Sequence, residues 1–181
     1  MSEHIYTYEN PTSQRDLDKA CKVLKQDGII VYPTDVNWAV GCSVSSPKAL
    51  DKIRKLKSAH PQEQPFSFLC DSLSMISQIA TVEQHAFRLL SKALPGAYTY
   101  LLPRNKLLPK HIKDKRRVVG VRIPDRELLC ALVKNLGEPL VTTSFSTLNS
   151  IKGALPEQLR FGYEIEESYG HVVDLILDLG K

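Results

Sequence analysis

Hydrophobic positions recur along the chain at two spacings, one typical of amphipathic helices and the other of short buried strands. A helix is expected over residues 13–26, because its apolar side chains repeat at helical spacing until Gly28. Residues 28–33 are nearly all apolar and end at a proline, which is typical of a buried strand. The same reasoning predicts helices from Pro47 to Leu56, from Ser72, over 82–94 and over 124–135, an acidic helix or turn over 157–167, strands over 37–44, 66–70, 97–102, 118–123, 140–144 and 172–177, and loops over 58–65 and 104–117.

The alternation of strands and helices predicts an α/β fold, a single domain over residues 1–181 with a twisted mixed sheet flanked by helices. The length of 181 residues suits one domain, and 43% hydrophobic with 24% charged residues is ordinary globular composition. Membrane spanning is excluded, because the apolar stretches are far shorter than the roughly 20 residues a bilayer requires. Residues 1–10 are polar and lack the pattern of a secretory signal. We therefore expect a soluble, cytoplasmic protein.

The four cysteines are well separated, at Cys21, Cys42, Cys70 and Cys130. Zinc sites and redox motifs use closely spaced cysteines, so no structural metal is expected. Each cysteine has apolar neighbours and is expected to be a reduced, small hydrophobic residue.

Basic residues are concentrated in two segments, although the net charge is only +4. Residues 104–126 contain nine Lys or Arg against two Asp, and residues 48–57 contain five against one, whereas residues 157–181 contain six acidic residues against two basic ones. Such a run is often only a solvated face. Its sign and density also suit a polyanion, either a nucleotide or a nucleic acid.

Polar groups at predicted strand ends are the candidates for ligand binding. Thr34 follows a buried strand, and Thr143, Ser144 and Ser146 belong to the hydroxyl-rich run that ends another. Strand ends are where α/β sheets place ligands, and hydroxyls and backbone amides there can hold a phosphate or a carboxylate. The simpler alternatives are that Thr34 only forms a turn and that the hydroxyl groups of residues 143–146 only decorate a strand end.

Two further candidates carry basic side chains. Arg122 lies between apolar strand positions, so its guanidinium needs either an anionic ligand or a buried carboxylate. Four of the five histidines are expected to be structural or on the surface. His60 follows Lys57 in a loop at a helix end, where its imidazole could reach a ligand.

Four segments, taken in order, resemble the YrdC/YciO family over about residues 15–180. They are Gly28-Ile-Ile-Val-Tyr-Pro-Thr-Asp35, Leu94-Pro-Gly96 with Thr99, Val119 to Pro124, and Leu140 to Ser144. Within the family, Tyr32-Pro-Thr-Asp35 followed by Trp38-Ala-Val-Gly-Cys42 is more similar to the YciO branch than to the YrdC branch.

The resemblance implies a concave basic groove for double-stranded RNA or a nucleotide. It also implies ATP-dependent synthesis of threonylcarbamoyl-adenylate from L-threonine and bicarbonate, with Mg²⁺ on the ATP, as the first step of a tRNA modification. In that pattern a Lys-x-Arg pair and a Ser-x-Asn pair hold the phosphates, and Arg122 corresponds to the arginine that holds the amino acid.

The chain departs from this pattern at several positions. The two pairs read Lys57-Ser58-Ala59 and Ser144-Phe145-Ser146, so half of each is missing, and Val36 and Trp38 replace hydroxyl residues. The sequence also ends at Lys181, where family members usually continue into a further strand. We expect either a family member that is naturally shorter or a truncated sequence.

Two functions follow from these observations. One is binding of double-stranded RNA through the basic groove, with Lys52, Lys55, Lys115, Arg116 and Arg117 as the candidate contacts. The other is an adenylate-forming enzyme of the threonylcarbamoyl-AMP synthase type, which would need positioning and charge stabilisation but no protein nucleophile.

Overall fold

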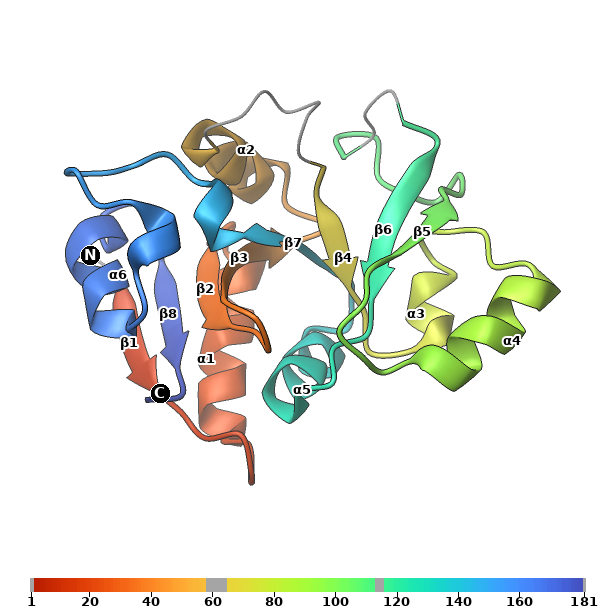
Figure 1. The fold of residues 1–181 in the computed structure, drawn as a ribbon, viewed down its shortest axis with the longest axis horizontal. Helices are drawn as coiled ribbons and strands as arrows, with labels where there is room; N and C mark the ends of the chain where they lie inside the picture. The colour runs from red at the N-terminus through yellow and green to blue at the C-terminus, as the bar shows by residue number, and fades with distance from the viewer. Residues whose placement is uncertain (1, 58–64, 113–115, 181) are drawn as a thin grey trace.

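The computed structural model describes residues 2–57, 65–112 and 116–180, which form one eight-stranded sheet with helices around it (Figure 1). The strand order is β1-β8-β2-β3-β7-β4-β6-β5. The strands are β1 (Glu3–Tyr6), β2 (Ile30–Pro33), β3 (Trp38–Ser43), β4 (Ser67–Leu69), β5 (Tyr100–Pro103), β6 (Val118–Arg122), β7 (Leu140–Ser144) and β8 (Leu175–Asp178).

The sheet is mixed, as predicted. β8 runs parallel to both β1 and β2, and β4 runs parallel to β6, while the other neighbouring pairs are antiparallel. β7 is the central link, because its two neighbours belong to the two halves seen at the left and right of Figure 1.

Six α-helices surround the sheet within the described ranges. They are α1 (Gln14–Lys25), α2 (Pro47–Leu56), α3 (Leu73–Ile76), α4 (Gln84–Ala93), α5 (Glu127–Leu136) and α6 (Gly162–Tyr169), with two short 3-10 helices, η1 (Phe145–Thr147) and η2 (Pro156–Gln158). α1 packs against α5 and against β2 and β3, and α6 packs against β8. The hydroxyl of Ser13 caps α1 by accepting a hydrogen bond from the backbone of Asp16, and Gly137 ends α5 at a φ of 80°.

The predicted helices and strands are present with small differences at their ends. The acidic segment after residue 156 forms η2 and then α6. The first strand is the exception, because β1 lies in the polar N-terminal segment where no element was predicted. Only Ile5 of its four residues is buried, so the sequence carries no strand pattern, and β1 is a strand because it pairs along β8.

The core lies on both faces of the sheet, and its largest fully buried side chains include Tyr32, Phe68, Phe145 and Tyr169. Tyr32 donates or accepts a 2.6 Å hydrogen bond with Thr142, so its hydroxyl is satisfied inside the core. In the part of the chain that the structure describes, no helix has the length and hydrophobicity needed to cross a membrane.

Candidate ligand-binding cleft

The turn between β2 and β3 is held by the hydroxyl of Thr34. Thr34 Oγ1 donates to the carbonyl of Asn37 at 2.7 Å and accepts from the backbone N–H groups of Val36 and Asn37 at 3.2 Å each. A threonine at the first position of a turn stabilises it in this way. The hydroxyl of Thr34 therefore has a structural role as well as a place at the cleft.

The carboxyl end of β7 presents a chain of hydroxyl groups. Ser144 Oγ lies 2.8 Å from Ser146 Oγ, and Thr143 Oγ1 lies 3.2 Å from Thr147 Oγ1. The amide of Asn37 donates to Ser144 Oγ at 3.2 Å, which joins the turn to β7. The predicted residues Thr143, Ser144 and Ser146 are thus neighbours at one strand end.

Arg122 ends β6 and reaches the same turn. Its Nη2 donates to Asp35 Oδ1 at 2.5 Å, and its Nε donates to the carbonyl of Gly96 at 3.0 Å. Burial raises the pKa of the Asp35 carboxyl, but hydrogen bonding and attraction by Arg122 outweigh this effect and hold the pKa below its usual value. Of the two acceptors that the sequence left open for Arg122, the described residues supply a carboxylate, although it is not a buried one, since the Asp35 side chain is 30% exposed.

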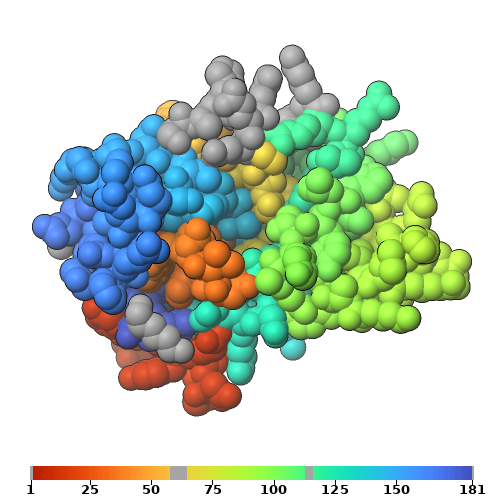
Figure 2. All heavy atoms as spheres, in the orientation of Figure 1, coloured from red at the N-terminus to blue at the C-terminus, as the bar shows by residue number. Residues whose placement is uncertain are grey.

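These groups line one cleft of about 300 Å³. Thr34, Arg122, Thr143 and Ser144 all contribute to its wall, so four of the predicted site residues meet although they come from the β2–β3 turn and from two strands, β6 and β7. The other lining residues are Val36, Asn37, Ala39, Ser67, Leu69, Thr99 and Thr142. In Figure 2 the orange atoms of this part of the chain lie between the blue atoms of the C-terminal segment and the green atoms around residue 100.

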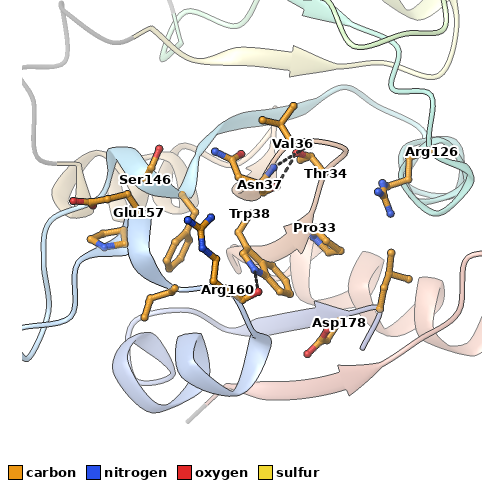
Figure 3. A pocket seen from close by; sticks show the side chains of 14 residues that line it. Pro33, Thr34, Val36, Asn37, Trp38, Arg126, Ser146, Glu157, Arg160 and Asp178 are labelled. Atoms are coloured by element: carbon orange, nitrogen blue, oxygen red, sulfur yellow. Dashed lines mark hydrogen bonds between the residues drawn. The ribbon is translucent and has the colours of Figure 1, made fainter. Parts of the chain in front are cut away.

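A larger cavity of about 410 Å³ adjoins the other side of the turn (Figure 3). The indole of Trp38 forms part of its wall, and its Nε1 donates to the carbonyl of Arg160 at 3.0 Å. Ser146 lines this cavity, and Thr34, Val36 and Asn37 line both spaces. The turn is therefore the partition between two adjacent cavities.

Lys57 lies at the end of α2 and is 7% exposed. Its Nζ lies 4.6 Å from the centre of the Phe66 ring, a cation–π contact. Burial and the nearby positive charge of Arg116 lower the pKa of Lys57 to about 8. The backbone of Lys57 pairs with that of Leu148, four residues after β7 ends, and its side chain lines neither of the two cavities.

The candidate RNA contacts that the structure describes do not line the cleft of about 300 Å³. Lys55 and Arg117 are exposed, and Arg116 lines a third cavity, of about 210 Å³, together with Arg104. Lys52 instead lies 3.3 Å from Asp174 and donates to the carbonyl of Asp27. His60 and Lys115 lie outside the described residues.

Asp35 lies in a motif that the sequence showed, but its contact with Arg122 was not predicted, nor was the place of Asn37 and Ser67 in the wall of the cleft. Asp35 and Asn37 have ordinary turn composition, and their roles depend on residues 87 and 107 positions away. Thr99 belongs to a motif that was recognised, but its place in the cleft depends on the pairing of β5 with β6. Within the described ranges, no group of three or more His, Cys, Asp or Glu side chains could hold a metal ion.

Comparison with known proteins adds a consistent family signal. The sequence profile described as "Telomere recombination" (Sua5_yciO_yrdC) matches residues 22–181. An uncharacterized protein of Haemophilus influenzae is 33% identical over 99% of this chain and 85% of its own length, and the uncharacterized protein YciO of Escherichia coli is 32% identical with the same coverage. A threonylcarbamoyl-AMP synthase of Saccharophagus degradans is 29% identical over 71% of this chain and 67% of its own length.

Solved structures agree with the sequence matches. The crystal structure of E. coli YciO superposes with a TM-score of 0.85 and 30% identity, covering 100% of this chain and 85% of that one. The structure of Pyrococcus abyssi Sua5 complexed with L-threonine superposes with a TM-score of 0.81 at 18% identity, covering 100% of this chain and 51% of that one, and it supports the fold alone.

Proposed function

The chain belongs to the Sua5/YciO/YrdC family, and from this premise we propose that its cleft binds a nucleotide as an adenylate-forming enzyme of the threonylcarbamoyl-AMP synthase type. The observation that carries the proposal is the convergence of Arg122, Thr143 and Ser144 on one cleft of about 300 Å³. A guanidinium facing hydroxyl groups in a partly enclosed space suits a phosphate or carboxylate ligand.

The phosphate groups are assigned to the end of β7 and to Lys57. Ser144 and Ser146 supply hydroxyls there, and Lys57 pairs with Leu148, four residues after the strand ends. Arg116 lines a different cavity but is near enough to Lys57 for their charges to repel each other, and a phosphate group bound at Lys57 would offset that repulsion.

The carboxylate of an amino acid is assigned to Arg122, which lines the same cleft. Mg²⁺ would enter on the triphosphate, because this ion keeps most of its water and commonly binds through substrate phosphates. It would shield the charge of the phosphates. The chain's own residues would position the two substrates and stabilise charge, which is sufficient for adenylate transfer without a protein nucleophile.

The relative named threonylcarbamoyl-AMP synthase supports this reaction class. L-threonine, bicarbonate and ATP are accordingly the proposed substrates, and the cytoplasm is the proposed location. Val36 lines both cavities and Trp38 lines the larger one. Neither side chain has a hydroxyl, so we expect threonine to be selected less strictly than in a cleft with hydroxyls at these positions.

Nucleotide titration followed by tryptophan fluorescence and calorimetry tests the proposal. Trp38 is the single tryptophan and lines the adjacent cavity, so its emission should change when ATP binds. Ser144→Ala should weaken ATP binding by about 10-fold or more, since a hydrogen bond to a charged group is worth about 1.5–3 kcal/mol. Ser91→Ala, an exposed serine on α4, is the control.

Pyrophosphate release then tests the reaction. Wild-type protein with ATP, L-threonine and bicarbonate should release pyrophosphate only when all three are present. Absence of ATP binding would reject the proposed function, whereas ATP binding without threonine-dependent release would reject the reaction and leave a nucleotide-binding protein.

Double-stranded RNA is the second candidate, favoured by the exposure of Lys55 and Arg117. Binding through phosphates should weaken steeply with salt. Lys55→Glu combined with Arg117→Glu should abolish it, whereas Lys52→Glu should have less effect because Lys52 already faces Asp174. Equal loss in both variants, or binding insensitive to salt, would reject this candidate.

A further inference from the structure

Two side chains of the turn between β2 and β3 contact residues of the cleft that are proposed to bind the ligand, namely Arg122 and Ser144. The carboxylate of Asp35 binds Arg122, and the amide of Asn37 binds the hydroxyl of Ser144. These contacts join the turn to β6 on one side and to β7 on the other. The turn thus fills, with one acid and one amide, the positions that an anionic ligand would use.

The contact between Asp35 and Arg122 changes what the cleft presents to a ligand. The Arg122 side chain is 13% exposed and its charge is largely balanced by Asp35, whose side chain is 30% exposed. Nε of Arg122 is also engaged, by the carbonyl of Gly96. A ligand carboxylate would therefore meet a guanidinium that has already committed Nε and one N–H of Nη2, with a second negative charge beside it that opposes its binding.

Asp35 is suited to this role by its place on the turn. It is held at Arg122 while its neighbours Thr34 and Val36 line the cleft. Hydrogen bonding by Arg122 also lowers the pKa of Asp35, so the carboxylate remains ionised at neutral pH and continues to occupy the guanidinium.

We propose that Asp35 is a specificity-determining residue whose carboxylate competes with a ligand carboxylate for Arg122. This inference rests on the proposed function, because it takes Arg122 to be the carboxylate site. As a consequence, the cleft should bind a carboxylate ligand more weakly than it would if Arg122 were not paired with Asp35. The discrimination is against the negative charge of the ligand rather than against its shape.

Asp35→Asn is the decisive variant, because the amide oxygen can still accept the hydrogen bond from Arg122 while the negative charge is removed. Calorimetry in the presence of ATP would compare L-threonine with L-threoninol, which lacks the carboxylate. The Asp35→Asn variant should bind L-threonine at least 10-fold more tightly than the wild-type protein does. Its affinity for L-threoninol should stay within about 2-fold of the wild-type affinity for L-threoninol. Asp125→Asn, an exposed residue shortly after β6, removes the same charge and should change neither affinity by more than about 2-fold.

The outcomes separate the two proposals. If ATP binds but Asp35→Asn binds L-threonine equally or more weakly than wild type, Asp35 does not compete and the inference is overturned. If ATP binds to neither protein, the proposed function fails and the inference fails with it. Asp35→Ser, checked for folding by circular dichroism, should also bind L-threonine more tightly, and serves if Asp35→Asn does not fold.

Discussion

The imidazole of His4 on β1 lies 3.0 Å from the carboxylate of Asp178 on the neighbouring strand β8. The other ring nitrogen of His4 lies 2.7 Å from Glu166 on α6. The side chains of His4 and Asp178 are 7% and 6% exposed. Gly162 leaves room for this pair, since a Cβ there would lie 2.1 Å from an oxygen of Asp178.

Replacing His4 should destabilise the protein. His4→Ala leaves the buried Asp178 carboxylate without this imidazole, and hydrogen bonds to charged groups contribute about 1.5–3 kcal/mol. We expect the free energy of unfolding in urea to fall by about that amount. His85→Ala, at an exposed position on α4, should change it by less than about 0.5 kcal/mol. Equal free energies of unfolding for His4→Ala and His85→Ala would show that the contact between His4 and Asp178 does not stabilise the fold.

The middle of β3 should not tolerate a side chain at Gly41. A Cβ there would lie 2.8 Å from the carbonyl oxygen of Val141 and 2.9 Å from the hydroxyl of Tyr32. Gly41→Ala should therefore lower the free energy of unfolding by about 1–3 kcal/mol, as overpacking of a core does. Tyr32→Phe removes one of the two clashing atoms, so the added cost of Gly41→Ala should be smaller in a Tyr32→Phe background. A cost that is unchanged in that background would contradict the predicted contact.

Lys57 should titrate near neutral pH. Burial and Arg116 lower its pKa from 10.5 to about 8, so the unfolded chain holds this proton more tightly than the folded protein does. Stability should consequently rise as pH increases from about 8 toward 10.5. NMR of ¹³C-methylated lysines would give the midpoint, with Lys57→Arg to assign the signal.

Two changes should raise the pKa of Lys57. Arg116→Gln removes the nearby positive charge, and added pyrophosphate supplies a negative one. A wild-type midpoint above about 10 would contradict the buried placement of Lys57.

The cysteines should differ in their reactivity. Cys21, Cys42 and Cys70 are buried, and burial raises the pKa of Cys42 and of Cys70 to about 12. Cys130 is partly exposed, although burial raises its pKa too. A thiol reagent at pH 8 should therefore label Cys130 first and slowly, and the other three only after denaturation. Mass spectrometry of the labelled native protein would identify the site, and early labelling of Cys42 would contradict the fold around β3.

Much of the fold could be predicted from the sequence because its strands and helices carry their own patterns. The run from Leu140 to Ser144 is one case, since its apolar start and hydroxyl end give both the strand and the candidate site. β1 is the opposite case. Its residues carry no strand pattern, and it forms because β8 offers a neighbouring edge, a partner more than 160 residues away.

The site was predictable in its residue types but not in its internal contacts. Arg122 had to find an anion, and chemistry alone did not say which one. The structure supplies Asp35, which reaches Arg122 because the turn after β2 crosses toward the end of β6. Such a pairing depends on strand order, and no local pattern in the sequence records that order.

The position of β8 between β1 and β2 has a consequence for the order in which the protein assembles. Within this chain, β1 and β2 are synthesised before β8 and do not pair with each other, and both pair with β8, which follows about 150 residues later or more. At about 5–20 residues per second, that delay is roughly 10 to 30 s. The half of the sheet containing β5 and β6 can pair during this time, while β1 and one edge of β2 remain open to chaperones. The β1–β8–β2 part of the sheet therefore cannot form before β8 is made, so translation rather than the intrinsic speed of strand pairing sets the earliest time of its formation.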